Sequence, residues 1–372
     1  MKRFKARLIS ATIVAMMGIT GMVGCGLATL DGTKTVATID GEEMPLGVAS
    51  FALRYSQAQT DYYYKQLSAM YQGLDLGTQN WDEIAEGETK TVGEQTKDDV
   101  LNRLEEMYEV RAHAKDYGVE LEQAEKDKMT AAAKDFIANN DRALLARMGV
   151  GERDVVEYLE LETYYQKSYD PMVKDIEVTV TDEESQQSTV TYSFISTNNV
   201  EEADAKAQLE ELLAEYKKEA DIATFDMKAF TEEKYASVMT TEVSFGSGDE
   251  EGTGLDSAVR EAAITLRDGE MYPEVIEGAS GGGFFIVRMD KAIDEEATAA
   301  KKDAIEKEKK QEAFDEMVDK WVEEADIKVN EKVWNKVKLS NKESYTIKLP
   351  EAVEEEIPLE EEIPLEEELP VE

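Results

Sequence analysis

The sequence predicts an α+β protein in which two helical segments flank a segment that contains strands. Helical periodicity is clearest over residues 97–117 and returns over residues 295–325. From about residue 174, β-branched and aromatic residues gather in short runs, of which 189–195 and 284–289 have the strongest strand character. Helices and strands that are segregated along the chain in this way are typical of α+β folds.

The first 24 residues have the composition of an export leader. Four basic residues precede an apolar run from about Leu8 to Val23, and the segment has no acidic residue. A charged stretch followed by an apolar stretch is typical of a signal peptide. The run is interrupted by glycines and is short for a membrane-spanning helix, which needs roughly 20 apolar residues. We therefore expect residues 1–24 to be a signal peptide, and an uncleaved anchor is the alternative.

The leader is followed by Cys25, the only cysteine of the chain, so no intrachain disulfide can form. Residues 22–26 resemble a bacterial lipobox, in which the cysteine thiol takes a diacylglycerol. The resemblance implies that Cys25 is lipidated and that residues 25–35 are a tether. Because two or more acyl chains hold firmly, it also implies a lipid-anchored protein on the extracytoplasmic face of a Gram-positive-type cell membrane. An ordinary signal peptide with a chance cysteine is the alternative interpretation.

The charge of the chain limits its partners. The formal net charge is −41, and removal of the four basic leader residues makes the mature chain −45. Such a charge repels nucleic acid and anionic lipid headgroups. We therefore expect no nucleic-acid partner, and the lipid on Cys25 has to provide the anchoring. The oligomeric state does not follow from these observations.

The N-terminal helical region is expected to span residues 36–173. It starts with a strand, a turn at Asp40-Gly41 and a second short strand. Helices are predicted from about residue 51, over 97–117 and at about 120–139, 141–148 and 152–169, with a loop at 72–95 that contains Trp81. Pro171 is expected to break the last helix, because the residue before a proline disfavours the helical conformation.

Tyrosine and methionine are concentrated in this helical region. The set comprises Tyr55, Tyr62, Tyr63, Tyr64, Met70, Tyr71, Met107, Tyr164 and Tyr165. Core packing is one interpretation. The other is a lining for unfolded client segments, because these side chains adapt to varied apolar surfaces.

The middle segment, residues 174–292, is predicted to combine strands and helices. Strands are expected at 177–180, 189–195, 241–245 and 284–289. Helices are expected at 200–219 and 255–266, with a loop at 246–254 that contains four glycines. Residues 293–340 return to helix.

The remaining residues, 341–372, are predicted to form a disordered acidic tail. Residues 351–372 contain eleven glutamates and no basic residue, and the hexapeptide Glu-Glu-Ile-Pro-Leu-Glu occurs at 355–360 and 361–366. Regular prolines prevent a continuous helix and the charge prevents collapse. Binding of Ca2+ or of cationic wall components is the alternative interpretation of the tail.

Residues 189–290 resemble a known domain in the order of their expected elements, which are a strand, a helix, a glycine-rich loop, a short helix, a turn and a terminal strand. Residues 255–270, LDSAVREAAITLRDGE, are similar to a helix and a Leu-x-x-Gly-Glu turn of parvulin-type (PpiC) peptidyl-prolyl isomerase domains. Residues 283–287 are similar to their closing Gly-Tyr-His-Ile-Ile strand, and residues 36–44 resemble the start of PrsA and SurA foldases. The resemblance implies an exported foldase in which a helical chaperone domain, made of 36–173 and 293–340, receives a parvulin-like insert at 174–292.

The resemblance also implies a groove for a proline-containing client segment. Its predicted lining is Ser193, Phe245, Leu255, Val259, Ile264 and Phe285. Ser193 and Phe285 stand where the family has histidines, and the only histidine of the chain, His113, lies in the helical region. We therefore expect a foldase or holdase for exported polypeptides with weak or absent isomerase activity, and we name no catalytic residue.

Other chemistry lacks the residues that it requires. Serine and cysteine nucleophiles have no histidine base in the C-terminal half, and a zinc site has no cysteine or histidine cluster. The acidic residues near 249–256 lack the spacing of an EF-hand, and the loop at 246–254 lacks the Lys-Ser/Thr of a phosphate-binding loop. We expect no metal and no cofactor. A non-catalytic surface lipoprotein that binds a wall polymer, a solute or a partner protein is the alternative function.

Overall fold

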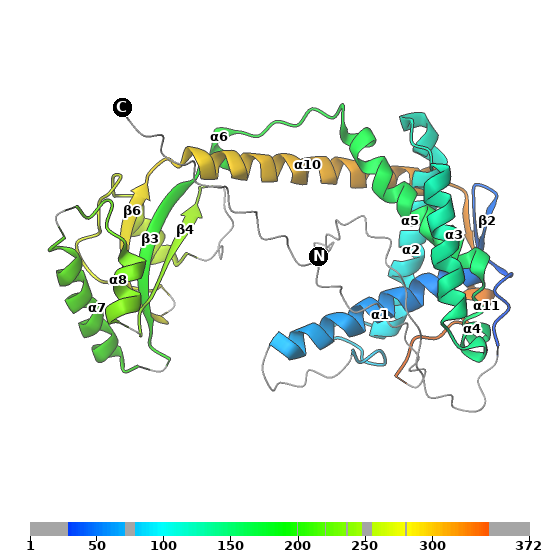
Figure 1. The fold of residues 1–372 in the computed structure, drawn as a ribbon, viewed down its shortest axis with the longest axis horizontal. Coiled ribbons are helices and arrows are strands. Elements are labelled where there is room, and N and C mark those ends of the chain that lie inside the picture. Colours follow the sequence, from blue (N-terminus) through cyan, green and yellow to red (C-terminus); the bar gives the residue numbers. More distant parts are fainter. Residues whose placement is uncertain are drawn as a thin grey trace, which may run out of the picture. The chain divides into compact units, whose positions relative to one another are not determined.

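The computed structural model describes residues 29–70, 79–198, 200–219, 221–235, 237–247, 255–279 and 281–341. The predicted signal peptide, Cys25, residues 248–254 of the glycine-rich loop and the tail beyond Asn341 lie outside these ranges. The described chain combines helices with two antiparallel sheets (Figure 1). The predicted α+β class is therefore confirmed.

The chain divides into two compact units. Unit 1 comprises residues 1–175 and 314–372, and unit 2 comprises residues 176–313. The longest helix, α10 (Glu295–Glu324), begins in unit 2 and ends in unit 1. The division thus falls inside this helix, whereas the sequence placed a boundary before it, at residue 293.

Unit 1 contains a small sheet and a set of helices. Its strands follow the order β2-β1-β7. The elements are β1 (Thr35–Ile39), β2 (Glu42–Pro45), α1 (Leu46–Met70), α2 (Val92–His113), the 3-10 helix η1 (Ala114–Tyr117), α3 (Gln123–Ala138), α4 (Arg142–Met148), α5 (Glu152–Val173), β7 (Ile327–Val329) and α11 (Glu331–Trp334).

The hairpin of β1 and β2 forms where the sequence predicted a turn. Asp40 and Gly41 have φ angles of 48° and 85°, and a two-residue turn with positive φ at both positions matches the twist of the strands that it joins. On its other edge β1 pairs with β7, so that Ala37 lies opposite Val329. The pairing with β7 was not predicted, because the two strands are far apart in the sequence.

Two predictions for the end of the first segment were wrong. Helix α5 continues through Pro171 to Val173, although a break was expected there. Tertiary packing outweighs the lost hydrogen bond, since Tyr165 and Tyr169 each pack 5.4 Å from the ring of Phe314 and the last residue, Val173, is buried. Residues 177–180, predicted as a strand, have no regular structure.

The end of α11 and the segment after it complete the main core of unit 1. Trp334, Val337 and Leu339 are buried in the same cluster as residues of β1, α1 and α2. The backbone N–H of Trp81 donates to Asn341 Oδ1 over 2.9 Å, which holds the loop before α2 against this segment. We call residues 335–341 the C-terminal strap.

Lys97 lies buried beneath this part of the chain. Its Nζ donates to the backbone oxygen of Trp334 over 3.3 Å and stands 4.7 Å above the indole ring. Burial, and then the charge of Lys338, lower the pKa of Lys97 from 10.5 to about 8. The unfolded chain therefore binds more protons than the folded chain between these two pH values, so that the free energy of unfolding rises with pH in that window.

Between pH 7 and pH 9.5, we expect the free energy of unfolding of the wild type to rise by about 1 kcal/mol more than that of Lys97→Met. This figure is about half of the energy that corresponds to the pKa shift, because solvent screens part of the effect. Urea titrations at both pH values, followed by tryptophan fluorescence, measure the difference. All three tryptophans of the chain lie in unit 1, so the signal reports this unit. Parallel pH dependences of the two proteins would contradict the assignment to Lys97.

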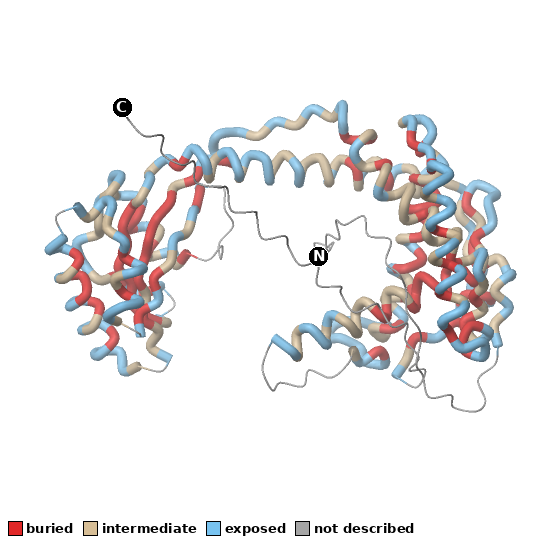
Figure 2. The backbone as a smooth tube through the Cα atoms, viewed as in Figure 1, coloured by how far each residue is buried: buried red, intermediate tan, exposed pale blue. Residues whose placement is uncertain are grey.

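Unit 2 is built on a four-stranded antiparallel sheet of order β4-β3-β6-β5. Its elements are α6 (Asp182–Ser185), β3 (Ser188–Ser196), α7 (Glu202–Tyr216), α8 (Met227–Lys234), β4 (Met239–Phe245), α9 (Ser257–Ala263), β5 (Ile276–Glu277) and β6 (Gly283–Lys291), followed by the first part of α10. Buried residues are concentrated in the central strands β3 and β6 (Figure 2).

No helix in the described ranges is long and apolar enough to cross a membrane.

Candidate functional site

The two faces of the unit 2 sheet have different partners. On β3, the even-numbered side chains from Val190 to Phe194 belong to one apolar cluster, together with Val259 of α9. Ile195 belongs to a second cluster that includes residues of α7 and α8, such as Leu209. Because successive side chains of a strand point to opposite faces, α9 covers one face of the sheet, and α7 and α8 cover the other.

Four apolar side chains form a row across the α9 face. Met239 of β4 lies opposite Phe194 of β3, Phe194 lies opposite Phe285 of β6, and Phe285 lies opposite Ile276 of β5. Directly opposed residues of antiparallel strands share a face. We call Met239, Phe194, Phe285 and Ile276 the apolar row.

The apolar row is closed at one end and open at the other. Phe285 and Ile276 are 9% and 8% exposed, Phe194 is half-buried, and Met239 is 52% exposed. The rings of Phe194 and Phe285 stack at 4.6 Å with an angle of 29° between their planes. An incoming apolar group would therefore meet the row at the β4 edge, on Met239 and Phe194.

Two glycines leave room for the stacked rings. A Cβ atom at Gly278 would lie 2.9 Å from Cε2 of Phe285, and one at Gly283 would lie 2.4 Å from Cε2 of Phe194. Asp256 holds the turn that contains Gly278, because its carboxylate accepts hydrogen bonds from the backbone N–H groups of Ala258 and Ala279. The start of α9 and the glycine-rich turn after β5 are thereby tied together beside the row.

The predicted groove residues do not line one open groove. Phe245, Leu255, Val259 and Phe285 share the apolar cluster under α9, each no more than 9% exposed. Ile264, predicted beside them, is 66% exposed. Helix α9 ends at Ala263, and Ile264 is the C-terminal cap of the helix. The side chain of Ile264 is therefore not held against the sheet, in contrast to side chains within α9.

Ser193 is also separated from the predicted groove. It lies on the α7 and α8 face, where its Oγ is 2.9 Å from Tyr216 Oη and 2.8 Å from Thr240 Oγ1. Thr231 Oγ1 donates to Thr240 Oγ1 over 2.8 Å, so that these four hydroxyl groups form a buried network. The residue that faces Phe285 is Phe194, one position along the strand, because a shift of one residue changes the face of the sheet.

Sequence reasoning missed Phe194, Met239 and Ile276 as members of the site. The alternation of Val190, Tyr192 and Phe194 was the available signal, since a bulky side chain at every second position marks one face of a strand. Met239 and Ile276 had no comparable signal, because their strands are short or begin at an exposed residue.

The chemistry of the apolar row is binding rather than proton transfer. None of its four side chains is ionisable. The neighbouring Tyr192 ring lies 5.8 Å from Phe285, and burial raises the pKa of its hydroxyl, so that it stays neutral at physiological pH. The guanidinium of Arg260 lies 5.6 Å from the ring centre of Phe245, which is not part of the row. The row offers stacking and apolar contact to a partner.

His113 is placed in a structural contact of unit 1. Its ring stacks on Trp321 of α10 with 4.1 Å between ring centres. Glu109 and Asp116 lie 3.9 and 3.5 Å from its nitrogens. The only histidine of the chain therefore joins the end of α2 to α10, at a place unrelated to the apolar row.

Three members of the tyrosine- and methionine-rich set, Tyr55, Met107 and Tyr165, pack against neighbouring side chains. Tyr55 stacks on Phe51 at 6.4 Å, and Met107 is 1% exposed. Arg103 lies 3.4 Å above the ring of Tyr165. Core packing thus accounts for these three members.

The second half of α1 presents the same residue types to solvent. Tyr63 is 59% and Met70 is 73% exposed. The hydroxyl of Tyr64 donates to Gln79 Oε1 over 2.7 Å, and Tyr62 accepts from Gln66 over 2.6 Å. A client lining at this end of α1 stays a prediction, and Tyr71 lies outside the described ranges.

Two surface hollows lie away from the apolar row. One, of about 480 Å3, lies over β1 and β7 in unit 1, and the other, of about 350 Å3, lies between α7 and residues 273–275 in unit 2. No residue of the predicted groove lines either hollow. Within the described ranges, no three histidine, cysteine, aspartate or glutamate side chains are grouped so that they could hold a metal ion.

Comparison with known proteins gives distant structural likenesses only. No protein-family model matches this chain, and no curated protein matches it. The chain is similar to the peptidylprolyl isomerase PrsA from Bacillus anthracis, with 18% identity, 61% of this chain and 99% of that chain covered, and a TM-score of 0.24.

Two further structures are similar at the same level. The PrsA isomerase from Bacillus cereus has 18% identity over 69% of this chain and 96% of that chain, with a TM-score of 0.26. The foldase protein PrsA from Streptococcus pneumoniae has 22% identity over 68% of this chain and 97% of that chain, with a TM-score of 0.22. TM-scores this low carry no conclusion about the present chain.

Proposed function

We propose that this chain is a lipid-anchored extracytoplasmic chaperone for exported proteins, which binds apolar client segments and has little or no prolyl isomerase activity. The lipobox-like sequence at Cys25 supports the location. The resemblance of residues 189–290 to a parvulin-type domain supports the class of client. In this proposal, unit 1 corresponds to the helical chaperone domain and unit 2 to the parvulin-like insert.

The stack of Phe194 on Phe285 carries the proposal. Phe285 stands where the resemblance expects a histidine, and its cross-strand neighbour is a second aromatic ring. Two stacked rings attract apolar groups and offer no proton and no charge. A site of this composition favours binding of a client side chain over polarisation of its peptide bond.

An extended client segment fits the open end of the apolar row. Met239 is exposed at the β4 edge, and methionine adapts its shape to different apolar partners. A prolyl residue suits such a surface, because it has an apolar ring and no backbone N–H that would need a hydrogen-bond acceptor. The strongly negative charge of the chain keeps complexes soluble and favours cationic clients.

We expect the mature chain to suppress aggregation of an unfolded client at stoichiometric amounts, and we expect Met239→Ser to lose about half of this effect, because the exposed apolar contact at the open end is removed. Light scattering during dilution of a denatured client measures the suppression. Ile293→Ser is the matched control, since Ile293 is 62% exposed in the same unit and lies outside the apolar row.

Prolyl isomerisation of a short proline peptide is the second readout of the same proteins. We expect the wild type to leave the uncatalysed rate unchanged. Robust catalysis that disappears in Phe285→Ala would overturn the non-catalytic part of the proposal. Absence of any aggregation suppression by the wild type would overturn the chaperone function and leave the surface-binding lipoprotein as the better account.

A further inference from the structure

One surface of unit 1 is basic although the chain as a whole is strongly acidic. Residues 327–341 contain four lysines and a single acidic residue, whereas the whole chain carries a charge of −41. The four side chains are exposed, and they are Lys328, Lys332, Lys336 and Lys338. We call them the basic surface. Lys328 pairs with Asp326, and no residue in the described ranges forms an ion pair with the other three.

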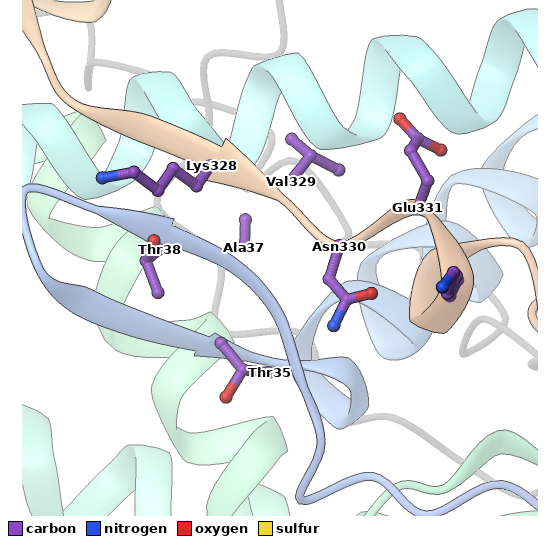
Figure 3. Close-up of a pocket in the computed structure, with 8 residues that line it drawn as sticks. Thr35, Ala37, Thr38, Lys328, Val329, Asn330 and Glu331 are labelled. Carbon is purple, nitrogen blue, oxygen red and sulfur yellow. The ribbon is translucent and has the colours of Figure 1, made fainter.

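The basic surface borders the hollow of unit 1 that was described above. Figure 3 shows this hollow over β1 and the end of β7, and it has a volume of about 480 Å3. Its charged lining residues are Lys328, Lys332 and one carboxylate, Glu331. Thr35, Thr38 and Asn330 are its polar lining residues, and Ala37 and Val329 its apolar ones. The hollow therefore suits a ligand in which carboxylates alternate with apolar side chains.

One lysine of the basic surface acts on the neighbouring core. The buried Lys97 contacts Trp334, within the same segment as the four lysines. Lys338 is one of the two causes that lower the pKa of Lys97. Asp98, Glu331 and Glu94 act in the opposite direction on this pKa, and Lys328 pairs with Asp326. The positive charge that has no ion-pair partner in the described part of unit 1 is therefore that of Lys332, Lys336 and Lys338.

We propose that the chain's own acidic repeat, residues 351–372, docks on the basic surface, with glutamates on Lys328 and Lys332 and with Ile-Pro-Leu side chains against Ala37 and Val329. The repeat alternates triplets of glutamate with apolar triplets centred on proline, and it has no basic residue. Its charge and its pattern both complement the hollow. The inference does not rest on the proposed chaperone function.

The connection between the two parts is long enough. The described chain ends at Asn341, which the backbone N–H of Trp81 holds in unit 1. Residue 355, where the first hexapeptide starts, follows 14 residues later, and such a stretch spans up to about 50 Å when extended. Each ion pair at an exposed surface is weak, but the covalent link raises the local concentration of the repeat to the millimolar range.

A zero-length carbodiimide cross-linker tests the contact in the whole chain, because it joins a lysine amine to a carboxylate only when the two groups touch. We expect cross-links from residues 351–372 to Lys328 and Lys332 to be about five times as abundant as those to Lys228 and Lys302, exposed lysines of unit 2. At 0.5 M salt we expect this preference to vanish, since screening shortens the range of the attraction to a few ångström.

Charge reversal provides the matched control. We expect the double variant K328E/K332E to give strongly reduced tail cross-links to the remaining lysines of residues 327–341, and K228E/K302E to leave the wild-type pattern unchanged. A mixture of unlabelled and nitrogen-15-labelled chains separates contacts within a chain from contacts between chains. Cross-links spread evenly over exposed lysines, or found mainly between labelled and unlabelled chains, would overturn the proposal.

Discussion

Replacing Arg54 with alanine is expected to lower the free energy of unfolding of unit 1 by about 3–5 kcal/mol. The substitution removes a large buried side chain, and it leaves two buried acceptors without their hydrogen-bond donor. Arg54 has no exposed surface and lies in the first half of α1. Its guanidinium donates to Gln57 Oε1 over 2.8 Å and to the backbone oxygen of Lys338 over 2.6 Å. The second bond joins α1 to the C-terminal strap across 284 positions of the sequence.

Arg54→Met separates the two contributions. Methionine fills much of the same volume but donates no hydrogen bond. We therefore expect Arg54→Met to lower the free energy of unfolding by less than Arg54→Ala does. Arg142 is exposed, and Arg142→Ala should change stability by less than about 0.5 kcal/mol. Urea unfolding followed by tryptophan fluorescence measures all three. Equal stability of Arg54→Ala and the wild type would mean that the strap is not held by this side chain.

Gly93→Ala is expected to destabilise unit 1 by about 2 kcal/mol, because overpacking against a fixed backbone outweighs the better helix propensity of alanine. Gly93 is the second residue of α2. In an unobstructed helix this substitution would stabilise by up to about 1 kcal/mol. Here a Cβ atom would lie 2.2 Å from the backbone oxygen of Leu339 and 3.0 Å from that of Trp81. The substitution therefore pushes on the C-terminal strap.

Gly151→Ala is the matched control for the direction of the stability change that Gly93→Ala is expected to cause. Gly151 is the N-terminal cap of α5 with a φ of −120°, and the nearest atom to a Cβ there lies 3.6 Å away. We expect a change of no more than about 1 kcal/mol at this position. Thermal unfolding of both variants gives the comparison. A gain in stability from Gly93→Ala would show that Leu339 and the strap do not pack on α2.

The candidate site illustrates which part of a site can be read from a sequence. Phe285 was found because the residues around it resemble a known closing strand. Its partner was placed at Ser193, yet the register of β3 against β6 puts Phe194 opposite Phe285. Register depends on which hydrophobic set faces the core, and a difference of one residue exchanges the two faces. Resemblance alone does not decide between neighbouring positions of a strand.

Local chemistry determined much of the fold. The Asp40-Gly41 turn and the periodicity of α10 each depend on residues only a few positions apart. So does the capping box of Thr91 and Glu94, although a loop was predicted over 72–95 and α2 in fact begins at Val92. Such patterns act within a turn of chain, so they can be read without knowing the rest of the structure. The α+β class and the order of most helices and strands follow from them, as does the expectation of a lipid on Cys25.

The tertiary structure decided what depends on distant partners. Val329 pairs with Ala37 in the sheet of unit 1, and the packing of α5 on Phe314 keeps the helix intact through Pro171. Contacts with distant segments also determine that Ile264 is exposed and that Phe194 stacks on Phe285. These outcomes depend on free energies of contact between segments up to nearly 300 positions apart, and no local pattern of residues records them.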